Sequence, residues 1–303
     1  MPGSPRTLAY LALASVCFFW GTVYLAFRIA VESFPPAILM GGRFLSAGVL
    51  ILLVAWAVGA RLPSRRDFLI TSFNGLLTLG LGIGAVAFSV QWIPSGWVAL
   101  LGTTTPFWMV GIEALRPGGN RPNAATLAGM VVGLLGALLL ILPGALAEGF
   151  GGGAVLSFVL LQIGAAGFAV GAIRERNHDS NTHPIVNAAV QEVATGLVFL
   201  VPGLLLPHDT IHWTSKGLLA VLYLIVFGGI VGFSAFIYAM KVLPVALVSI
   251  YTYVNPIVAV IVAAWLYGEK LGWIEGLSMM FVVAGVIIVQ RFAYRERIAT
   301  ATA

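Results

Sequence analysis

Long apolar stretches of about 20 residues recur along the whole chain, separated by short segments that carry most of the charged side chains. At about 1.5 Å per residue, a helix of this length crosses the roughly 30 Å hydrocarbon core of a bilayer. Hydropathy, combined with turn and charge signals, predicts ten such helices and an all-α membrane protein. The predicted helices span about residues 8–28, 36–58, 67–91, 95–116, 124–142, 152–173, 184–206, 217–240, 246–267 and 272–291.

The overall composition leads to the same class of protein. The chain is 60% hydrophobic and 9% charged, whereas soluble domains are roughly 25% charged. A soluble protein with so few charges could not cover this much apolar surface, so the lipid bilayer is the expected surrounding of the chain.

The 16 Lys and Arg residues are distributed unevenly between the predicted loops. If the N-terminus is cytoplasmic, the outer segments carry only Lys216 and Lys241, and Arg28 and Arg43 fall within helices. Such an excess of basic residues marks the cytoplasmic side, so both termini are expected there and no nucleic-acid partner is expected. The inner segments carry Arg6, Arg61, Arg65, Arg66, Arg116, Arg121, Arg174, Arg176, Lys270, Arg291, Arg295 and Arg297.

The chain also contains an internal repeat. The stretch IPSGWVALLGTTTPFWMV is followed much later by LPVALVSIYTYVNPIVAV, and Pro94 and Pro106 align with Pro244 and Pro256 at one constant offset. Ten helices divide into five and five, and because five is odd the second copy enters the membrane from the opposite side. The repeat predicts two inverted five-helix units, residues 1–148 and 149–303.

The paired prolines predict where a solute binds. Proline weakens a helix, and non-helical backbone at membrane depth is tolerated only inside protein or beside a water-lined cavity. Two weakened helices at matching positions of inverted repeats point to a central substrate site. Polar residues gather at the same places, whereas the simpler alternative is that the prolines only bend the helices. These polar residues are Thr103, Thr104, Thr105, Ser249, Tyr251, Thr252, Tyr253 and Asn255.

Two longer segments resemble a known family. FFWGTVYLAFRIAVESFPPAILMGGRFLSAGVL and YAMKVLPVALVSIYTYVNPIVAVIVAAWLYGEKL, which ends near Gly268 and Glu269, are similar to the EamA-type ten-helix exporters of the drug/metabolite transporter superfamily. The pattern is most similar to the bacterial aromatic amino-acid exporters. It departs from the family at RPGGN, where a second Gly-Glu is expected, and at Phe168, where the family usually has Trp.

Rings and polar side chains near the predicted cavity are the candidate substrate-binding residues. Trp20 and Tyr24 are four residues apart and therefore share a helix face, and Phe168 aligns with Trp20 in the repeat. Rings accept apolar side chains and attract cations, while hydroxyl and amide groups bind the polar part of a solute. The alternative for Trp and Tyr is a belt at the membrane interface, which explains Trp213 and Trp273. The candidates are Trp20, Tyr24, Phe88, Thr105, Trp108, Phe168, Tyr238, Tyr251 and Asn255.

A second set is expected to serve gating or structure. A charge at the centre of a membrane helix costs about 2.5–3.5 kcal/mol on insertion scales, which favours a functional role for Arg43 and Glu192. Arg43 aligns with Gln191, beside Glu192; direct substrate binding by Arg43 is the alternative to a gating role. The set is Arg43, Pro94, Pro106, Glu192, Pro244 and Pro256.

These features predict a bacterial inner-membrane exporter of amino acids, aromatic and other bulky neutral ones, that works by alternating access. The alternative is a multidrug or metabolite efflux carrier, which normally needs an acidic residue within a helix; the first and sixth predicted helices have none at mid-span. No HExxH or Ser/His/Asp arrangement suggests an enzyme, and no cofactor or metal is expected. Glu113, Glu192 and His183 could carry protons, and the sequence leaves open proton antiport or facilitated export.

Overall fold

A computed structural model of the chain describes residues 5–89, 91–92, 98, 101–119, 121–148, 153–207, 210–267 and 273–301. Throughout these ranges the regular secondary structure is helical, without a β-strand. Six of the described helices are long and apolar enough to cross a membrane. They are Pro5–Val31, Pro36–Ala57, Arg65–Ser89, Val155–Asn177, Pro184–Leu205 and Ser215–Val242.

Each of these six overlaps a helix predicted from the sequence. They correspond to α1 (Pro5–Val31), α2 (Pro36–Ala57), α3–η1–α4 (Arg65–Gly75, Leu76–Ile83 and Gly84–Ser89), α8 (Ala154–Asn177), α9 (Pro184–Leu205) and α10–η2–α11 (Ser215–Tyr223, Leu224–Phe233 and Ser234–Val242). The other predicted spans overlap α6 (Thr105–Leu115), α7 (Ala124–Glu148), α12 (Val245–Val248) with α13 (Tyr251–Tyr267), and α14 (Trp273–Ala301). Pro94 lies outside the described residues.

Local sequence signals explain where several helices begin. Pro36 and Pro184 occupy the first turns of α2 and α9, where proline costs no helical hydrogen bond. Ser64 accepts a hydrogen bond from the Asp67 amide at the start of α3 (3.2 Å). Such caps satisfy amides that the first turn of a helix leaves without a partner.

Two of the long helices contain a π-helical segment, η1 (Leu76–Ile83) and η2 (Leu224–Phe233). In a π-helix each backbone hydrogen bond spans one more residue than in an α-helix, and such segments are frequent at functional sites. Both segments are rich in glycine, with the sequences LLTLGLGI and LIVFGGIVGF. The missing side chains allow helices from the other part of the chain to approach closely.

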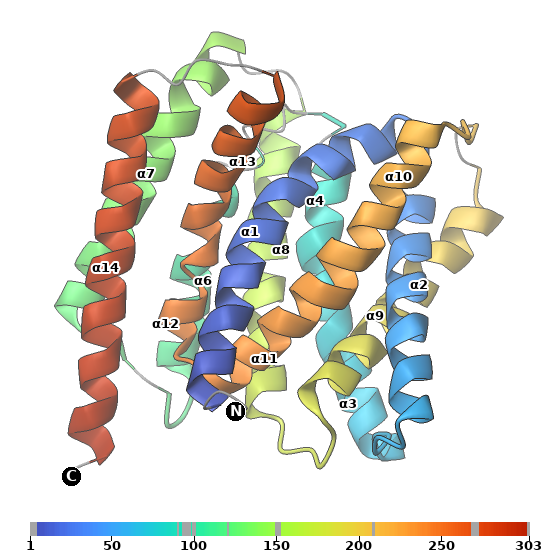
Figure 1. Cartoon of the computed structure of the whole chain (residues 1–303), viewed down its shortest axis with the longest axis horizontal. Coiled ribbons are helices and arrows are strands. Elements are labelled where there is room, and N and C mark those ends of the chain that lie inside the picture. The colour runs from blue at the N-terminus through green and yellow to red at the C-terminus, as the bar shows by residue number, and fades with distance from the viewer. Residues whose placement is uncertain are drawn as a thin grey trace.

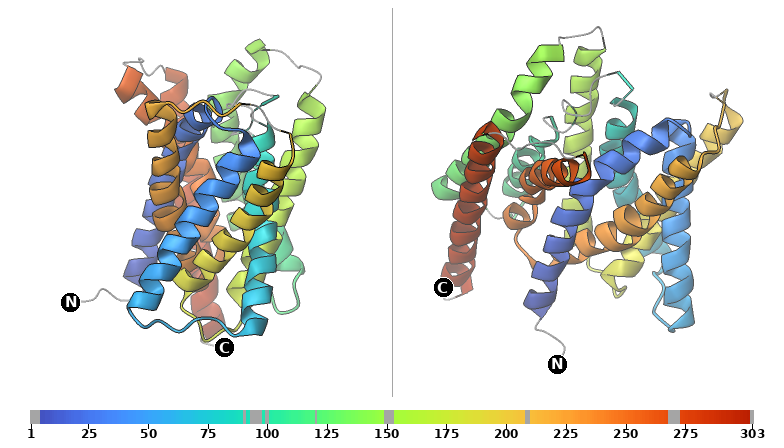
Figure 2. Two further views of the ribbon diagram at one scale, coloured as in Figure 1. Left: turned by 90° about the vertical axis from the view of Figure 1, so that its right-hand side faces the viewer. Right: turned by 45° about the horizontal axis from the view of Figure 1, so that its top comes forward.

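The main helix pairs join the N-terminal half (residues 5–148) to the C-terminal half (residues 153–301). Helix α2 packs along α9, α7 along α14, α8 along η1, and α1 against η2 and α13. Figure 1 shows α7 beside α14 at one edge of the bundle and α2 near α9 at the other, and Figure 2 shows the same bundle from two further directions. The two halves are therefore interlocked rather than side by side.

Glycines make the contact between α2 and α9 close in both directions. A Cβ added at Gly48 would lie 2.7 Å from the carbonyl oxygen of Ala189, and one added at Gly196 would lie 2.5 Å from the amide nitrogen of Leu45. No larger side chain fits at either position without moving a backbone. Small residues bring membrane helices together in this way.

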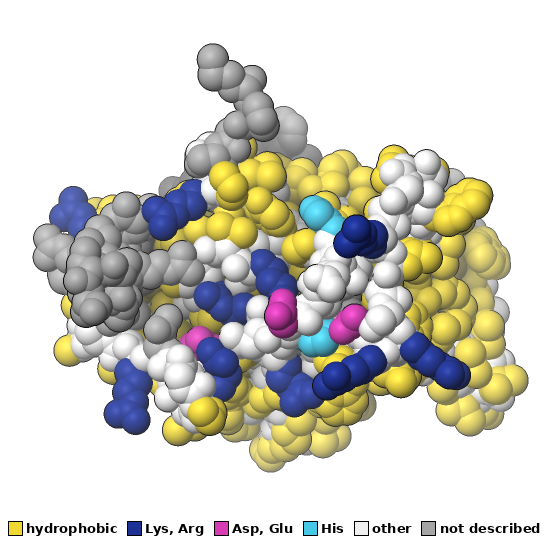
Figure 3. Space-filling model, turned by 90° about the horizontal axis from the view of Figure 1, so that it is seen from below, with side chains coloured by type: hydrophobic (Ala, Val, Ile, Leu, Met, Phe, Trp, Pro, Cys, Tyr) yellow, Lys and Arg dark blue, Asp and Glu magenta, His cyan; other side chains and the backbone are white. Residues whose placement is uncertain are grey.

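Helices α1 and α14, which carry the two ends of the described chain, have those ends at the same end of the bundle (Figure 1). Figure 3 looks onto this end of the molecule and shows Lys and Arg side chains gathered around its middle and rim. The charged loops therefore lie where the termini lie, and the flanks of the bundle are apolar.

Candidate binding cavity

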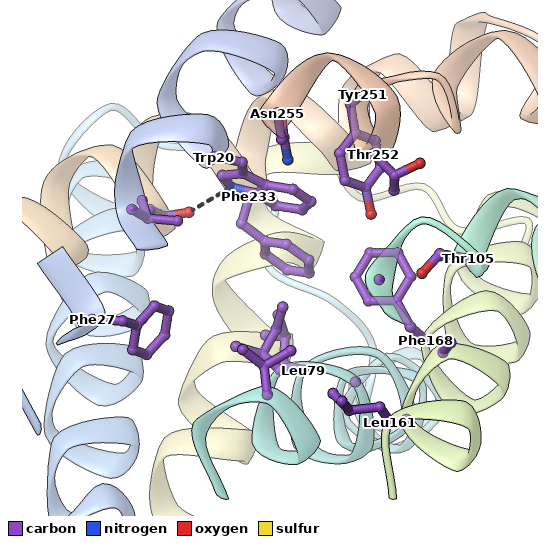
Figure 4. Close-up of a pocket in the computed structure, with 18 of the residues that line it drawn as sticks. Trp20, Phe27, Leu79, Thr105, Leu161, Phe168, Phe233, Tyr251, Thr252 and Asn255 are labelled. Atoms are coloured by element: carbon purple, nitrogen blue, oxygen red, sulfur yellow. Dashed lines mark hydrogen bonds between the residues drawn. The ribbon is translucent and has the colours of Figure 1, made fainter. Parts of the chain in front are cut away.

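A cavity lies between the two halves, where η1 and η2 pass close to α1 and α8 (Figure 4). Its volume is about 110 Å³, which is smaller than the roughly 300–1,000 Å³ of typical small-molecule sites. Helices from both halves contribute to its wall. The lining residues are Trp20, Val23, Phe27, Arg43, Phe44, Leu79, Gly82, Ile83, Val86, Gly102, Thr105, Leu161, Gly164, Ala165, Phe168, Gly228, Phe233, Tyr251, Thr252 and Asn255.

Aromatic rings form a continuous cluster on one side of this cavity. The Trp20 ring centroid lies 5.0 Å from that of Tyr251, 5.2 Å from that of Phe236 and 6.3 Å from that of Phe168. Phe236 is fully buried behind the lining rings and contacts all three. Edge-to-face and offset contacts at these distances stabilise ring pairs, so the cluster is a fixed surface against which an apolar group can pack.

Trp20 and Phe168 each pack against a glycine in the π-helical segment of the other half. A Cβ at Gly82 in η1 would lie 2.8 Å from Cβ of Phe168, and a Cβ at Gly232 in η2 would collide with the Trp20 indole nitrogen. Trp20 has one further contact, because its indole N–H donates to the carbonyl oxygen of Gly228 (3.1 Å). The hydrogen bond fixes the N–H edge of the indole ring against η2, while the ring borders the cavity.

Polar groups reach the cavity beside two interruptions in the helices. Residues 103–104 form a turn before α6, and residues 249–250 form a turn between α12 and α13. Thr105 follows the first interruption, and Tyr251, Thr252 and Asn255 follow the second. With its amide nitrogen as donor, Asn255 bonds the carbonyl oxygens of Cys17 (3.0 Å) and Tyr251 (2.9 Å). The breaks thus place hydroxyl and amide groups at the wall of the cavity.

Arg43 is the charged side chain among the described lining residues. It is 5% exposed, and its guanidinium carbon lies 4.2 Å from the ring centroid of Phe44 and 4.7 Å from that of Phe27. Both rings offer their faces to the cation, which partly offsets the cost of burying it. Glu192 is fully buried on α9 but does not line the cavity.

The sequence-predicted binding residues separate into two groups. Trp20, Thr105, Phe168, Tyr251 and Asn255 line one cavity, together with Arg43 from the predicted gating set. The side chain of Tyr24 lies outside the described part of the structure.

Three other candidates lie away from the cavity. Phe88 stacks on Phe199, with ring centroids 6.5 Å apart, because its position is two residues beyond the lining residue Val86 and hence on the far face of the helix. Trp108 is 39% exposed and donates to Oε1 of Gln162 (2.9 Å). The hydroxyl of Tyr238 donates to the carbonyl oxygen of Pro5 (3.5 Å).

The predicted prolines lie near the interruptions. Pro106 stands in the first turn of α6, and Pro244 is the residue before α12. The backbone of Pro256 continues α13, while its side chain lies outside the described residues. The turns at residues 103–104 and 249–250 come before Pro106 and Pro256.

The sequence reasoning missed several apolar lining residues. Phe27 lies on one helix face with Trp20 and Val23, which precede it by seven and four residues, and this spacing could have indicated it. Phe44 directly follows Arg43, and no pattern in the sequence singles it out. The sequence does not single out Phe233 either, because it is one of several large apolar residues in a uniformly apolar segment.

A buried polar network joins three helices near the end of the bundle that carries the termini. Glu175 is 1% exposed and accepts hydrogen bonds from the side-chain amides of Asn74 (2.9 Å) and Asn187 (2.8 Å). Arg174 donates from Nε to Oδ1 of Asn74 (3.1 Å). The network connects α3, α8 and α9, and the sequence analysis had placed Arg174 only in a basic loop.

Comparison with known proteins decides the family. Residues 7–142 and, separately, residues 153–291 match the EamA-like transporter family. This chain belongs to the EamA-like transporter family. It is a multi-pass inner-membrane protein with a transporter role.

Individual relatives agree with this assignment. The inner membrane transporter YedA of Escherichia coli K12 is 33% identical over 282 residues, which cover 92% of this chain and 89% of YedA. A protein of Streptantibioticus cattleyicolor named a probable terminal-alkyne amino-acid exporter is 26% identical, with 93% of each chain covered. A solved crystal structure has the same fold, with a TM-score of 0.79 and 20% identity over 96% of this chain and 99% of that chain.

Proposed function

We propose that this transporter exports amino acids, chiefly aromatic and other bulky neutral ones, in the manner of the aromatic amino-acid exporters. The observation that carries the proposal is the composition of the cavity wall, in which a cluster of rings adjoins a few hydroxyl and amide groups and one guanidinium. Rings bind an apolar side chain, while the polar groups bind the ammonium and carboxylate that all amino acids share. The relative named as an amino-acid exporter supports the same substrate class.

The architecture that goes with this proposal is a ten-helix bundle of two inverted repeats, residues 1–148 and 149–303. The separate family matches to the two halves support it, as do the reciprocal contacts of Trp20 with Gly232 and Phe168 with Gly82. We place both termini in the cytoplasm, since basic side chains gather at their end of the bundle (Figure 3).

Alternating access then requires the two halves to rock about the cavity between them. In that motion Trp20 and Phe168, which belong to different halves, move relative to each other, and each ring slides along the glycine-rich segment of the opposite half that it packs against. The cavity would face the cytoplasm to load an amino acid and the outside to release it.

Reconstitution of the purified protein into liposomes, with radiolabelled phenylalanine, tests the proposal. Phenylalanine uptake above that of empty liposomes is expected, with competition by unlabelled tyrosine or leucine. A pH gradient across the liposomes separates proton antiport, in which uptake follows the gradient, from facilitated export, in which it does not.

The cation tetraphenylphosphonium provides the contrasting substrate. An efflux carrier for lipophilic cations would transport it, but the charged side chain at the cavity wall is the cationic Arg43. Transport of tetraphenylphosphonium without transport of any neutral amino acid would replace this proposal by multidrug efflux.

A further inference from the structure

Arg43 carries a positive charge deep inside the bundle, where burial of a charge is unfavourable unless another group compensates for it. It lies in α2, which packs along α9, and its side chain is 5% exposed. Taking an unpaired charge out of water costs several kcal/mol. The two flanking rings reduce this cost but supply no negative charge.

The described residues give Arg43 no ion-pair partner. The salt bridges formed within the described ranges join Arg116 to Glu113 and His178 to Asp67, so no described carboxylate oxygen lies within 4.0 Å of the guanidinium. The Nε of Arg43 is buried and has no hydrogen-bond partner. An arginine on a cavity wall therefore keeps donor capacity that the protein itself does not use.

A carboxylate stands nearby without making contact. Glu192 of α9 is fully buried, and neither of its carboxylate oxygens has a hydrogen-bond partner. The two charges lie against successive glycines of η2. A Cβ at Gly228 would lie 3.4 Å from Nη1 of Arg43, and one at Gly229 would lie 2.8 Å from Oε1 of Glu192. Glu192 therefore lies near Arg43 but leaves its donors open.

We infer that Arg43 binds the carboxylate of the transported amino acid, an inference that rests on the proposed function. A guanidinium presents donors in a planar fork that matches a carboxylate in two parallel hydrogen bonds. The rings of Phe27 and Phe44 hold this fork in place and exclude water from its faces. The substrate carboxylate thus takes the contact that Glu192 does not make.

The shape of the cavity then sets the orientation of the amino acid. Figure 4 shows Phe27, which lies against Arg43, across the cavity from Phe168 and Thr105. A carboxylate at the Phe27 end leaves the side chain pointing toward the rings of Trp20 and Phe168. Solutes that have the ring but lack the carboxylate lose the interaction with Arg43 and are selected against.

The test compares phenylalanine with phenylalaninamide, in which a neutral amide replaces the carboxylate. Both compete against labelled phenylalanine for uptake into proteoliposomes, and the ratio of their half-inhibitory concentrations is measured for each variant. The wild-type protein is expected to prefer phenylalanine by about tenfold or more, since hydrogen bonds between charged groups are among the strongest. In Arg43→Gln this ratio is expected to fall close to one, through weaker inhibition by phenylalanine.

Two further variants make the test decisive. Arg43→Lys keeps the charge but not the planar fork, and an intermediate ratio is expected; it also serves if Arg43→Gln does not yield folded protein by size-exclusion chromatography. Lys216→Gln removes an exposed positive charge away from the cavity and should leave the ratio unchanged.

The outcomes separate this inference from the proposed function. If the wild-type protein transports phenylalanine and the Arg43 variants keep the wild-type ratio, Arg43 is not the carboxylate-binding residue although the proposed function stands. If the wild-type protein neither transports nor binds neutral amino acids, the proposed function fails and the inference falls with it.

Discussion

Trp20 on α1 and Phe168 on α8 align with each other in the predicted sequence repeat, but the structure holds them differently. Each ring packs against a glycine in the π-helical segment of the opposite half, Gly232 for Trp20 and Gly82 for Phe168. Only the Trp20 ring carries an N–H, and it donates to the carbonyl oxygen of Gly228. The same packing scheme is therefore used twice, with one added hydrogen bond in η2.

Arg43 and Gln191, which align in the predicted sequence repeat, differ even more. Arg43 borders the cavity, whereas Gln191 is fully buried against Gly75, with neither side-chain amide atom hydrogen-bonded. Apolar packing is thus alike in the two halves, and the charged and hydrogen-bonding groups are not. A solute placed in the cavity would meet rings from both halves but a charged side chain from the N-terminal half only.

Replacing Trp20 or Phe168 by alanine is expected to reduce phenylalanine uptake more than any other change. Trp20→Ala deletes three ring contacts and a hydrogen bond, and Phe168→Ala deletes two ring contacts. Truncation of a buried aromatic residue costs about 3–5 kcal/mol. Phenylalanine uptake per folded molecule should fall more than tenfold (~1.4 kcal/mol) in Trp20→Ala and less in Phe168→Ala. Equal losses would show that the additional ring contact and the hydrogen bond of Trp20 do not contribute to transport.

Filling the glycines should have the next largest effect. Gly232→Ala brings its Cβ within 2.6 Å of the carbonyl oxygen of Phe227 as well as onto Trp20, while Gly82→Ala meets Phe168 at 2.8 Å. Overpacking of this kind costs about 1–3 kcal/mol. Thermal unfolding of the detergent-purified protein should show a larger loss for Gly232→Ala, because its Cβ would lie closer to the neighbouring atoms, one of which is a backbone oxygen, than the Cβ of Gly82→Ala would.

Two other glycines provide matched controls. A Cβ at Gly42 or Gly111 would meet no described atom within 4 Å. Because alanine favours helix over glycine by about 1 kcal/mol, Gly42→Ala and Gly111→Ala should leave the unfolding temperature unchanged or raise it slightly. A marked drop in either control would mean that the glycine effects do not arise from the contacts described.

Trp20→Phe makes the rings at positions 20 and 168 chemically alike, and it should lower stability less than Trp20→Ala does. It removes the indole N–H that bonds Gly228 and leaves most of the ring surface in place. The expected loss of stability is about 1 kcal/mol, the usual worth of one hydrogen bond. Stability equal to the wild type would mean that packing on Gly232, and not the hydrogen bond, positions Trp20.

Trp108→Ala should have the smallest effect on transport. Trp108 is 39% exposed, bonds Gln162 and does not line the cavity. Phenylalanine uptake is expected to stay within about twofold of the wild type, as is usual for surface changes. A loss as large as that of Trp20→Ala would extend the binding surface beyond the cavity described.

The sequence carried most of the information about which parts of the chain cross the membrane. Apolar length is a one-dimensional property, so the long helices could be placed from it. The repeat made Phe168 a candidate beside Trp20, and both residues line the same cavity. The paired prolines indicated the neighbourhood of the two interruptions, although the turns come a few residues earlier.

The direction in which each helix faces was harder to obtain. In a helix of a soluble protein, polar residues mark the side that faces solvent, but a membrane helix is apolar all round. Phe88 and Phe27 therefore look alike in the sequence, and only packing shows that Phe27 borders the cavity and Phe88 does not. The widened turns of η1 and η2 also rotate the residues beyond them, which a regular helical period does not anticipate.

The interlocking of the halves has a consequence for how the chain is held together. Since α2 lies against α9 and α7 against α14, each half finds its principal packing partners in the other. Beyond this packing, the covalent link between α7 and α8 keeps one copy of each non-identical half in every molecule. Each molecule therefore has one Arg43 at its cavity wall, supplied by the N-terminal half.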